Sequence, residues 1–521
     1  MEQNTNPHKE VEQSQPIISR RKLLGVLGAA GATVLAGGIL ASPQIANAGT
    51  LDVFHVKDYG ATGNGVTDDT AAIQSAINAA GVNGGIVFFP VGKYLVSSTL
   101  LVNKPGVSLR GSSPKASIIQ TNAATGDIIA IGASPAFVYA EVRDLQITAT
   151  VARTSGYAIS VNGCEDYNLE NLILFRSTSL ATGHGLHFSA TSGLGFIRAL
   201  DIEIVGAFIG IVIDNGNDRY FNQLWLRGNL TAGSTGILLT NSGGDWFTDV
   251  EVVQFERGVN LSPASGSVVG WAKFHNVLAD TNTLYGWLFD GAGSTWGIVM
   301  DSCWAGTTGV TNINARGMLI NNIDGLTAVG MRIVNSGGHG IEIGTNSKNV
   351  SFKGGFITGS SYAAAGNAHG IATALNYTGG LTIDGMKVGQ TAGQMNTQGY
   401  GIFINGGNDN YTLIGNDVTG NVTGGINDGA NGADKIIRAN RGYKTENGGR
   451  SIFNGTGAQK IFMIAHGLAK APDYYHVTAA SAGAATAFYV SADATNITVT
   501  YTNAPASGTN NVVLEWSARI K

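Results

Sequence analysis

The sequence predicts an all-β chain: a right-handed parallel β-helix of about 11–12 coils, with an N-terminal capping helix and a small C-terminal β-sandwich. The main observation is a glycine followed by a short apolar strand, which returns about every 27 residues from Gly156 to Gly425. Gly makes up 75 of 521 residues and charged residues only 13%, which suits many tight turns and few surface charges. Crossovers between parallel strands are right-handed in almost all proteins, so the coils are expected to wind that way.

Charge and cysteine content exclude two other classes of protein. The formal net charge of −4 argues against a nucleic-acid binder, which needs a basic surface. Two cysteines in so long a chain exclude a scaffold held by disulfides. The chain is therefore expected to fold around an apolar solenoid core and to have no nucleic-acid partner.

Residues 1–48 are expected to be an export signal of the twin-arginine type. Arg20 and Arg21 precede an apolar stretch from Gly25 to Leu40, and residues 46–48 supply a small-residue cleavage site. The stretch is short and rich in Gly and Ala, so no integral membrane segment is expected in the mature chain. An ordinary secretory signal or an uncleaved anchor is the alternative. The sequence thus predicts a secreted, extracellular bacterial protein.

Residues 49–110 are expected to form the N-terminal cap. Asp68, Asp69 and Thr70 form a helix start signal, and small or apolar residues then recur at helical spacing, so we predict a helix over 68–81. A solenoid has unpaired strand edges at its open end, and one amphipathic helix laid across that end covers them.

A family resemblance lies within this cap. The chain reads Val-Lys-Asp-Tyr-Gly-Ala-Thr-Gly-Asn-Gly-Val-Thr-Asp-Asp-Thr from Val56 to Thr70, and Pro-Val-Gly-Lys-Tyr from Pro90 to Tyr94. These residues resemble the opening of the pectate-lyase-like superfamily, which includes polygalacturonase-related and rhamnogalacturonase-related proteins and phage tailspikes. The resemblance implies a right-handed parallel β-helix. It leaves the activity open, because members hydrolyse, eliminate, epimerise or only bind glycans.

The polygalacturonase catalytic pattern is not carried over to this chain. Its Asn-Thr-Asp element is missing, and the pair Asp68-Asp69 lies in the cap. The string Arg519-Ile520-Lys521 ends the chain, and the periodicity of the coils explains Gly338-His339-Gly340. His339, like His369 and His184, precedes a repeat glycine and is expected to serve a turn.

Residues 111–445 carry the β-helix, and the period stops after them. Residues 446–521 contain short strands separated by Gly, Ser, Asn and Pro, from which we predict a β-sandwich module. Three roles stay open for this module: carbohydrate binding, assembly of a homotrimer, and a structural end cap.

Two rows of polar positions run through the repeat. In one strand of each coil a polar residue precedes apolar residues one and three positions later, and we call this polar residue the leader. The leaders are Asp144, Asn171, Asp201, Gln223, Asp249, Asn276 and Asp301. Apolar residues one and three positions later face the core, so the residue two positions after each leader lies outside. This outer row is Gln146, Ile173, Glu203, Trp225, Glu251, Leu278 and Cys303. Asp and Asn leaders satisfy turn amides and stack on one another, which is a structural explanation for the first row.

The outer row contains the candidate site. Glu203 and Glu251 are expected two coils apart, about 10 Å, with Trp225 between them. The acid and base of an inverting glycosidase lie about 6.5–9.5 Å apart. We therefore predict Glu203 and Glu251 as catalytic residues, followed by Asp249 and Asp201. The predicted substrate-binding residues are Trp225, Arg219, Asp245, Trp246 and Lys273. The alternative is a solvated sheet face with scattered ion pairs.

Three functions follow from these residues. The first is a glycoside hydrolase that acts on a polysaccharide through carboxylate acid and base. The second is a lyase or epimerase on a uronate-containing glycan, with Arg219 or Lys273 as base. The third is a glycan-binding surface protein without catalysis. No metal site or cofactor is expected, because no Cys/His cluster has zinc spacing, except that a lyase would use Ca²⁺ to neutralise the uronate.

Overall fold

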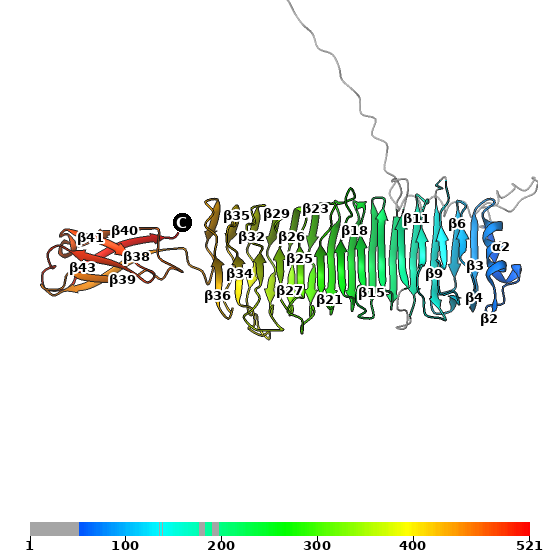
Figure 1. The fold of residues 1–521 in the computed structure, drawn as a ribbon, viewed down its shortest axis with the longest axis horizontal. Coiled ribbons are helices and arrows are strands. Elements are labelled where there is room, and N and C mark those ends of the chain that lie inside the picture. Colours follow the sequence, from blue (N-terminus) through cyan, green and yellow to red (C-terminus); the bar gives the residue numbers. More distant parts are fainter. Residues whose placement is uncertain (1–51, 135, 138, 177–182, 190–196) are drawn as a thin grey trace, which may run out of the picture. The chain divides into compact units, whose positions relative to one another are not determined.

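The computed structural model describes residues 52–521, apart from 135, 138, 177–182 and 190–196. The expected export signal, residues 1–48, lies outside the described residues. Within them, no helix is long and apolar enough to cross a membrane. The described chain is nearly all β, and most of its strands stack in parallel into one solenoid (Figure 1). The predicted fold class is confirmed.

One sheet of the solenoid has 13 parallel strands, one from each coil. They are β5 (Leu100–Val102), β8 (Ile129–Ile131), β10 (Tyr157–Val161), β12 (His184–Ser189), β14 (Ile209–Asn215), β16 (Thr235–Leu239), β19 (Arg257–Leu261), β22 (Tyr285–Phe289), β25 (Arg316–Ile320), β28 (Ile341–Ile343), β31 (Ile371–Thr373), β34 (Tyr400–Ile404) and β36 (Gly424–Asp428). The glycine repeat predicts slightly fewer coils because β5 and β8 precede Gly156, its first glycine.

The larger sheet has 24 strands. They are β1 (Val53–His55), β2 (Asn64–Asp68), β3 (Gly85–Phe89), β4 (Gly92–Val96), β6 (Val107–Gly111), β7 (Ser117–Thr121), β9 (Ala140–Ala149), β11 (Tyr167–Leu174), β13 (Ile197–Val205), β15 (Arg219–Arg227), β17 (Ser242–Gly243), β18 (Trp246–Val253), β20 (Val268–Gly270), β21 (Lys273–Asp280), β23 (Ser294–Asp301), β24 (Trp304–Gly306), β26 (Asp324–Val329), β27 (Arg332–Val334), β29 (Lys348–Lys353), β30 (Phe356–Thr358), β32 (Leu381–Asp384), β33 (Lys387–Val388), β35 (Tyr411–Ile414) and β37 (Lys435–Arg438).

A corner divides each long strand of this sheet into two parts. The corner residues have a left-handed backbone, with φ between 51° and 58°; they are Asp144, Asn171, Asp201, Gln223, Asp249, Asn276 and Ser302. Asp and Asn adopt this conformation more readily than other non-glycine residues, which explains the polar leaders. We call the part before the corner the first face and the part after it the second face.

The corner corrects one coil of the predicted rows. Strand β23 places Asp301 opposite His275, so Ser302 and not Asp301 occupies the corner. Likewise Trp304 follows Leu278 in the outer row, and Cys303 is buried in the core. The Asp-Ser-Cys-Trp string imitates the repeat pattern, but the register of this coil is shifted by one residue.

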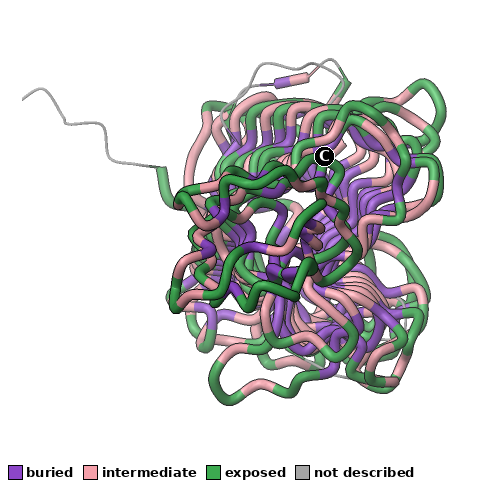
Figure 2. The backbone as a smooth tube through the Cα atoms, turned by 90° about the vertical axis from the view of Figure 1, so that its left-hand side faces the viewer, coloured by how far each residue is buried: buried purple, intermediate pink, exposed green. Residues whose placement is uncertain are grey.

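The core is a continuous stack of apolar side chains inside the coils. Phe221, Phe247 and Phe274 follow one another on successive coils, with stacked rings whose centroids are 4.5 and 5.2 Å apart. Buried positions of neighbouring coils line up behind one another (Figure 2). This regular stacking fixes which residues of each coil face outward.

The N-terminal end follows the same plan. Strand β1 pairs in parallel with β3, β3 with β6, and β6 with the first face of β9, so coils begin already at Val53. A 3₁₀ turn, η1 (Val56–Tyr59), follows β1, and helix α2 (Thr70–Ala80) covers the first coil and exchanges two hydrogen bonds with Leu101 through Gln74. Asp69 is buried and accepts hydrogen bonds from the amides of Thr62 and Gly63, at 2.7 and 3.1 Å. The acidic pair of the cap therefore has a structural role.

The C-terminal residues form two antiparallel three-stranded sheets with a core of their own. One sheet has the order β38 (Glu446–Gly455), β43 (Gly508–Arg519) and β40 (Tyr474–Ala479). The other has the order β39 (Ile461–Ala465), β42 (Asn496–Tyr501) and β41 (Phe488–Ala492), and a short 3₁₀ turn η2 (Ala482–Ala484) lies before β41. Phe462, Val499 and Leu514 are among the buried residues between the sheets. This is the β-sandwich that the sequence predicts.

Candidate functional site

The carboxylate row expected from the sequence exists as a geometric feature of the second face. The strand register pairs Glu203 with Trp225 and Trp225 with Glu251, so these side chains follow one another on successive coils. Glu251 is exposed, and Glu203 and Trp225 are half-buried. Two coil spacings of about 4.8 Å separate the two glutamates along the axis. Arg176 lies 3.3 Å from Glu203, whereas no ion pair joins Glu251 among the described residues. The catalytic role of this row stays a prediction.

Asp201 and Asp249 lie at the corner, next to the carboxylate row. The side-chain amide of Asn276 donates to Asp249 Oδ1 at 2.7 Å, and Asn171 donates to Asp144 in the same way at 2.7 Å. These contacts are the corner ladder that the leader residues suggest. They give Asp249 a structural function that does not depend on a ligand.

Arg219 and Asp245 do not lie on the outer surface, contrary to the prediction. Both side chains are 0% exposed, and Arg219 Nη1 donates to Asp245 Oδ1 at 3.0 Å. Burial raises the pKa of Asp245, which the Arg219 charge opposes. Arg219 also donates to the carbonyls of Asn215 and Gly216. Because both side chains are buried, the pair cannot contact a glycan. The prediction was wrong because the corner reverses which positions before the leader face inward, and the count back from the leader did not include that reversal.

A groove runs beside the first face, at the place where the chain passes from β17 and β20 into the strands of that face. Two hollows of about 600 and 470 Å³ are joined by one of about 250 Å³ that shares residues with both. We call it the aromatic groove. The lining includes Asn217, Asp218, Tyr220, Gly243, Gly244, Trp246, Val268, Trp271, Lys273, Trp296, Asp324 and Lys348. Four of its aromatic side chains are exposed: Tyr220, Trp246, Trp271 and Trp296.

The aromatic rings of the groove are held by their neighbours. The Tyr220 and Trp246 rings are 5.8 Å apart, and Lys273 Nζ lies 3.9 Å from the centre of the Trp246 ring. Trp271 and Trp296 meet edge to face at 4.6 Å. The Trp296 indole rests on Gly270, where an added Cβ would come within 3.0 Å of it. Exposed, supported rings of this kind present apolar faces to a ligand.

A histidine–aspartate pair lies next to the groove. On β21, Lys273 and His275 both point outward because Phe274 between them is buried. His275 Nδ1 lies 2.9 Å from Asp301 Oδ2 on the next coil, and the two side chains are 57% and 49% exposed. The Asp301 contact orients the ring, so that Nε2 is left for another partner. Lysine, histidine and tryptophan thus share one patch of the first face.

The predicted substrate-binding residues lie on both sides of the corner. Trp246 and Lys273 lie in the groove, as substrate-binding residues would, while Trp225 lies on the second face, five positions beyond Tyr220 on β15. His275, Trp271 and Trp296 were not predicted. The positions just before the corner of each coil would have brought out Trp246, Lys273 and His275. Trp271, in contrast, follows the end of β20 with a left-handed backbone, and Trp296 lies near the start of β23, outside these rows.

Among the described residues, no group of three His, Cys, Asp or Glu side chains is placed to hold a metal ion. The charged groups of the patch are Lys273, His275 and Asp301 on the first face, and Asp218, Asp324 and Lys348 also line the groove.

Known proteins resemble parts of this chain. Residues 53–260 match the family model described as rhamnogalacturonase A/epimerase, pectate lyase-like. An alignment over 235 residues with the non-secreted LysM effector LysM19 of Penicillium expansum is 27% identical and covers 37% of this chain and 18% of that protein. A stretch of 74 residues, 13% of this chain, is 43% identical to mannuronan C5-epimerase AlgE4 of Azotobacter vinelandii and covers 13% of that protein. The chain thus spans less than a fifth of the length of these curated relatives.

Solved structures share the fold. The tailspike protein gp49 of Pseudomonas phage LKA1 is 13% identical, with 89% of this chain and 99% of that chain covered and a TM-score of 0.57. The N-terminal fragment of gene product 12 of bacteriophage Phi29 is 15% identical, with 77% and 74% covered and a TM-score of 0.55. At these identities the likeness concerns the fold alone. The match over residues 53–260 and the parallel solenoid together support the resemblance to the pectate-lyase-like superfamily.

Proposed function

We propose that this protein binds a uronate-containing polysaccharide along the aromatic groove and acts on it as a lyase or an epimerase. The observation that carries the proposal is the position of Lys273, which lies over Trp246 in the groove and two residues from His275 on the same outward side. A ring-stacking surface, a cation and an oriented histidine are therefore within one patch.

Each group has a chemical task in this proposal. Trp246 and Tyr220 stack on sugar rings, and the groove guides the chain along the solenoid axis, past one coil after another. Lys273 binds the uronate carboxylate and stabilises the negative charge that develops when the neighbouring carbon loses its proton. His275 Nε2 accepts that proton, and Asp301 holds the ring in the required tautomer.

The fate of the carbanion decides between the two reactions. In a lyase, the electron pair of the carbanion forms a double bond to the next carbon, and the bond between that carbon and the glycosidic oxygen breaks. The departing oxygen then takes up a proton. In an epimerase, a proton returns to the same carbon from the opposite side. The family description, which includes epimerase, and the partial match to a mannuronan epimerase support this class of chemistry.

A glycoside hydrolase is the second candidate. Its support is the row Glu203, Trp225, Glu251 on the second face, with a separation near that of an inverting acid and base. The row lies outside the aromatic groove. For this reason we place it second to the lyase or epimerase proposal.

A product assay on defined polysaccharides tests the proposal. Full-length protein is incubated in D₂O with polygalacturonate, polymannuronate, a rhamnogalacturonan and a neutral glucan, with and without EDTA to test for a Ca²⁺ requirement. We expect a uronate polymer to yield either ultraviolet-absorbing unsaturated ends or deuterium at the epimerised carbon. New reducing ends without either signal would replace the proposal by hydrolysis. No change in any polymer would leave only glycan binding.

A further inference from the structure

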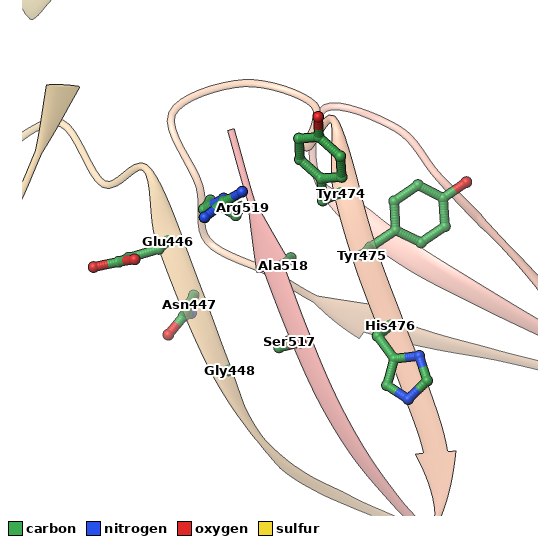
Figure 3. A pocket seen from close by; sticks show the side chains of 9 residues that line it. All are labelled: Glu446, Asn447, Gly448, Tyr474, Tyr475, His476, Ser517, Ala518 and Arg519. Carbon is green, nitrogen blue, oxygen red and sulfur yellow. The ribbon is translucent and has the colours of Figure 1, made fainter. Parts of the chain in front are cut away.

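The C-terminal sandwich has a hollow on its outer surface that no part of the solenoid chemistry uses. It measures about 650 Å³ and lies on the sheet of β38, β43 and β40. Figure 3 shows Tyr474, His476 and Arg519 around it, with Glu446 on the neighbouring strand. All its lining residues come from this one sheet, so the hollow belongs to the module itself.

The strand register explains how the hollow arises. Arg519 is the cross-strand neighbour of both Glu446 and Tyr474, and these three large side chains form one row. In the next row Ser517 lies between Gly448 and His476. Because Ser and Gly are small, the second row forms a low floor beside the wall of the first.

The polar groups of the wall are available for a ligand. The Arg519 guanidinium lies 5.2 Å from the centre of the Tyr474 ring, which holds it in place. Among the described residues, neither Glu446 nor Arg519 forms an ion pair, although they are direct neighbours across the strands. Two rows further along the sheet, Arg450 and Glu515 do pair with each other, at 2.5 Å. Glu446 and Arg519 therefore remain free of ion pairs among the described residues.

We propose that this hollow binds a neutral saccharide unit. A sugar hydroxyl both donates and accepts hydrogen bonds, so different hydroxyls of one saccharide match the guanidinium of Arg519 and the carboxylate of Glu446, which Figure 3 shows on neighbouring strands. The exposed Tyr474 offers an apolar face for a sugar ring. A carboxylated sugar would gain Arg519 but face Glu446, so the balance of one positive and one negative charge favours an uncharged ligand.

This site differs from the aromatic groove in the ligand it prefers. In the groove, Lys273 lies beside the outward His275 and is proposed to hold a uronate carboxylate for the reaction. In the hollow, Arg519 has the carboxylate Glu446 as its cross-strand neighbour, and the hollow offers binding without a proposed base. The module would hold the protein on a neutral part of a polysaccharide or cell surface. The inference does not depend on the reaction proposed for the solenoid.

Binding measurements on full-length protein test the inference. The probes are neutral tetrasaccharides of gluco, galacto, manno and rhamno configuration, with tetragalacturonate for comparison, and binding is followed by calorimetry. Tyr474→Ala and Glu446→Gln are the test variants. The matched control is Tyr489→Ala, a tyrosine 66% exposed on β41 of the other sheet. Trp246→Ala serves to separate binding in the groove.

We expect at least one neutral tetrasaccharide to bind, with a loss of about tenfold in Tyr474→Ala and no loss in Tyr489→Ala or Trp246→Ala. Binding weaker than about 1 mM for every neutral probe would overturn the inference. So would binding lost in Trp246→Ala and retained in Tyr474→Ala. Light scattering compares the oligomeric state of Tyr474→Ala with that of the wild-type protein. A difference would show that a second copy of the chain occupies this face and would assign it to self-assembly instead.

Discussion

Trp246 is the residue whose removal should weaken glycan binding most selectively. Its ring is exposed, lies beside Tyr220 and carries Lys273 over its face. We expect Trp246→Ala to weaken binding of the processed polysaccharide by about 1–3 kcal/mol, or about 5- to 150-fold, if a sugar stacks on it as bases stack on aromatic rings.

The control for that variant is Trp304→Ala. Trp304 is exposed to a similar extent but lies in the outer row of the second face, away from the groove. Both variants should fold, since an outward side chain contributes little to the core. Equal losses of affinity, measured by calorimetry, would show that the groove is not the binding surface.

The buried pair of Arg219 and Asp245 should matter for folding and not for binding. Removal of one partner leaves an uncompensated charge inside the solenoid, which costs about 3–5 kcal/mol. We therefore expect Asp245→Ala to lower the free energy of unfolding by about that amount. The surface pair Arg176 and Glu203 is the comparison, because Arg176→Ala should cost less than about 1 kcal/mol. Urea unfolding of both variants checks this, and similar costs would contradict the assignment.

At the scale of single strands, His339 and His369 should make the solenoid sensitive to acid. His339 Nδ1 accepts the amide of His369 at 3.0 Å, and His369 Nδ1 accepts the amide of Tyr400 at 3.2 Å. Burial, helped by Arg316, lowers the pKa of His339 to about 4. As the pH falls, His339 therefore becomes protonated in the unfolded chain before it does so in the folded coil. The stabilisation is complete above pH 6.5 and is lost as the pH falls towards 4.

The size of this effect can be measured against a variant. Between pH 7 and pH 5 the free energy of unfolding of the wild-type protein should fall by about 2 kcal/mol because of His339. In His339→Gln it should fall correspondingly less over the same interval. His476→Gln, an exposed histidine of the sandwich, is the control. If wild type and His339→Gln show the same change in urea midpoint with pH, His339 is not the acid-sensitive residue.

The elements also show what could be read from the sequence. The glycine spacing and the polar leaders predicted the coils, because a left-handed corner in every coil selects Asp and Asn. The capping helix was predicted over 68–81 and begins at Thr70. The coil of Asp301 was shifted by one residue, since its corner is a serine and only the register with β21 reveals it.

The candidate site was harder to predict for a physical reason. Glu203, Trp225 and Glu251 were placed on one face because they share a row, and the register agrees. Arg219 and Asp245 were placed outside because the count did not include the change of phase at the corner. Trp271, in a left-handed turn after β20, meets Trp296 of β23, and no position of the repeat pattern encodes that contact.

At the scale of the whole molecule, export in folded form stays a proposal based on the N-terminal sequence. Replacement of Arg20 and Arg21 by Lys should leave the precursor in the cytoplasm, because the folded route requires the arginine pair. Fractionation of cells with an antibody against the chain measures this. Unchanged secretion of the double variant would point to the ordinary secretory route.

The most direct test of the whole account compares two single substitutions on the polysaccharide that the wild-type protein converts. His275→Gln removes the proposed base of the first face, and Glu251→Gln removes the proposed carboxylate of the second. We expect the initial rate of product formation to fall by about two to four orders of magnitude in His275→Gln and to stay near wild type in Glu251→Gln. The reverse result, an active His275→Gln and an inactive Glu251→Gln, would contradict the account and move the chemistry to the carboxylate row.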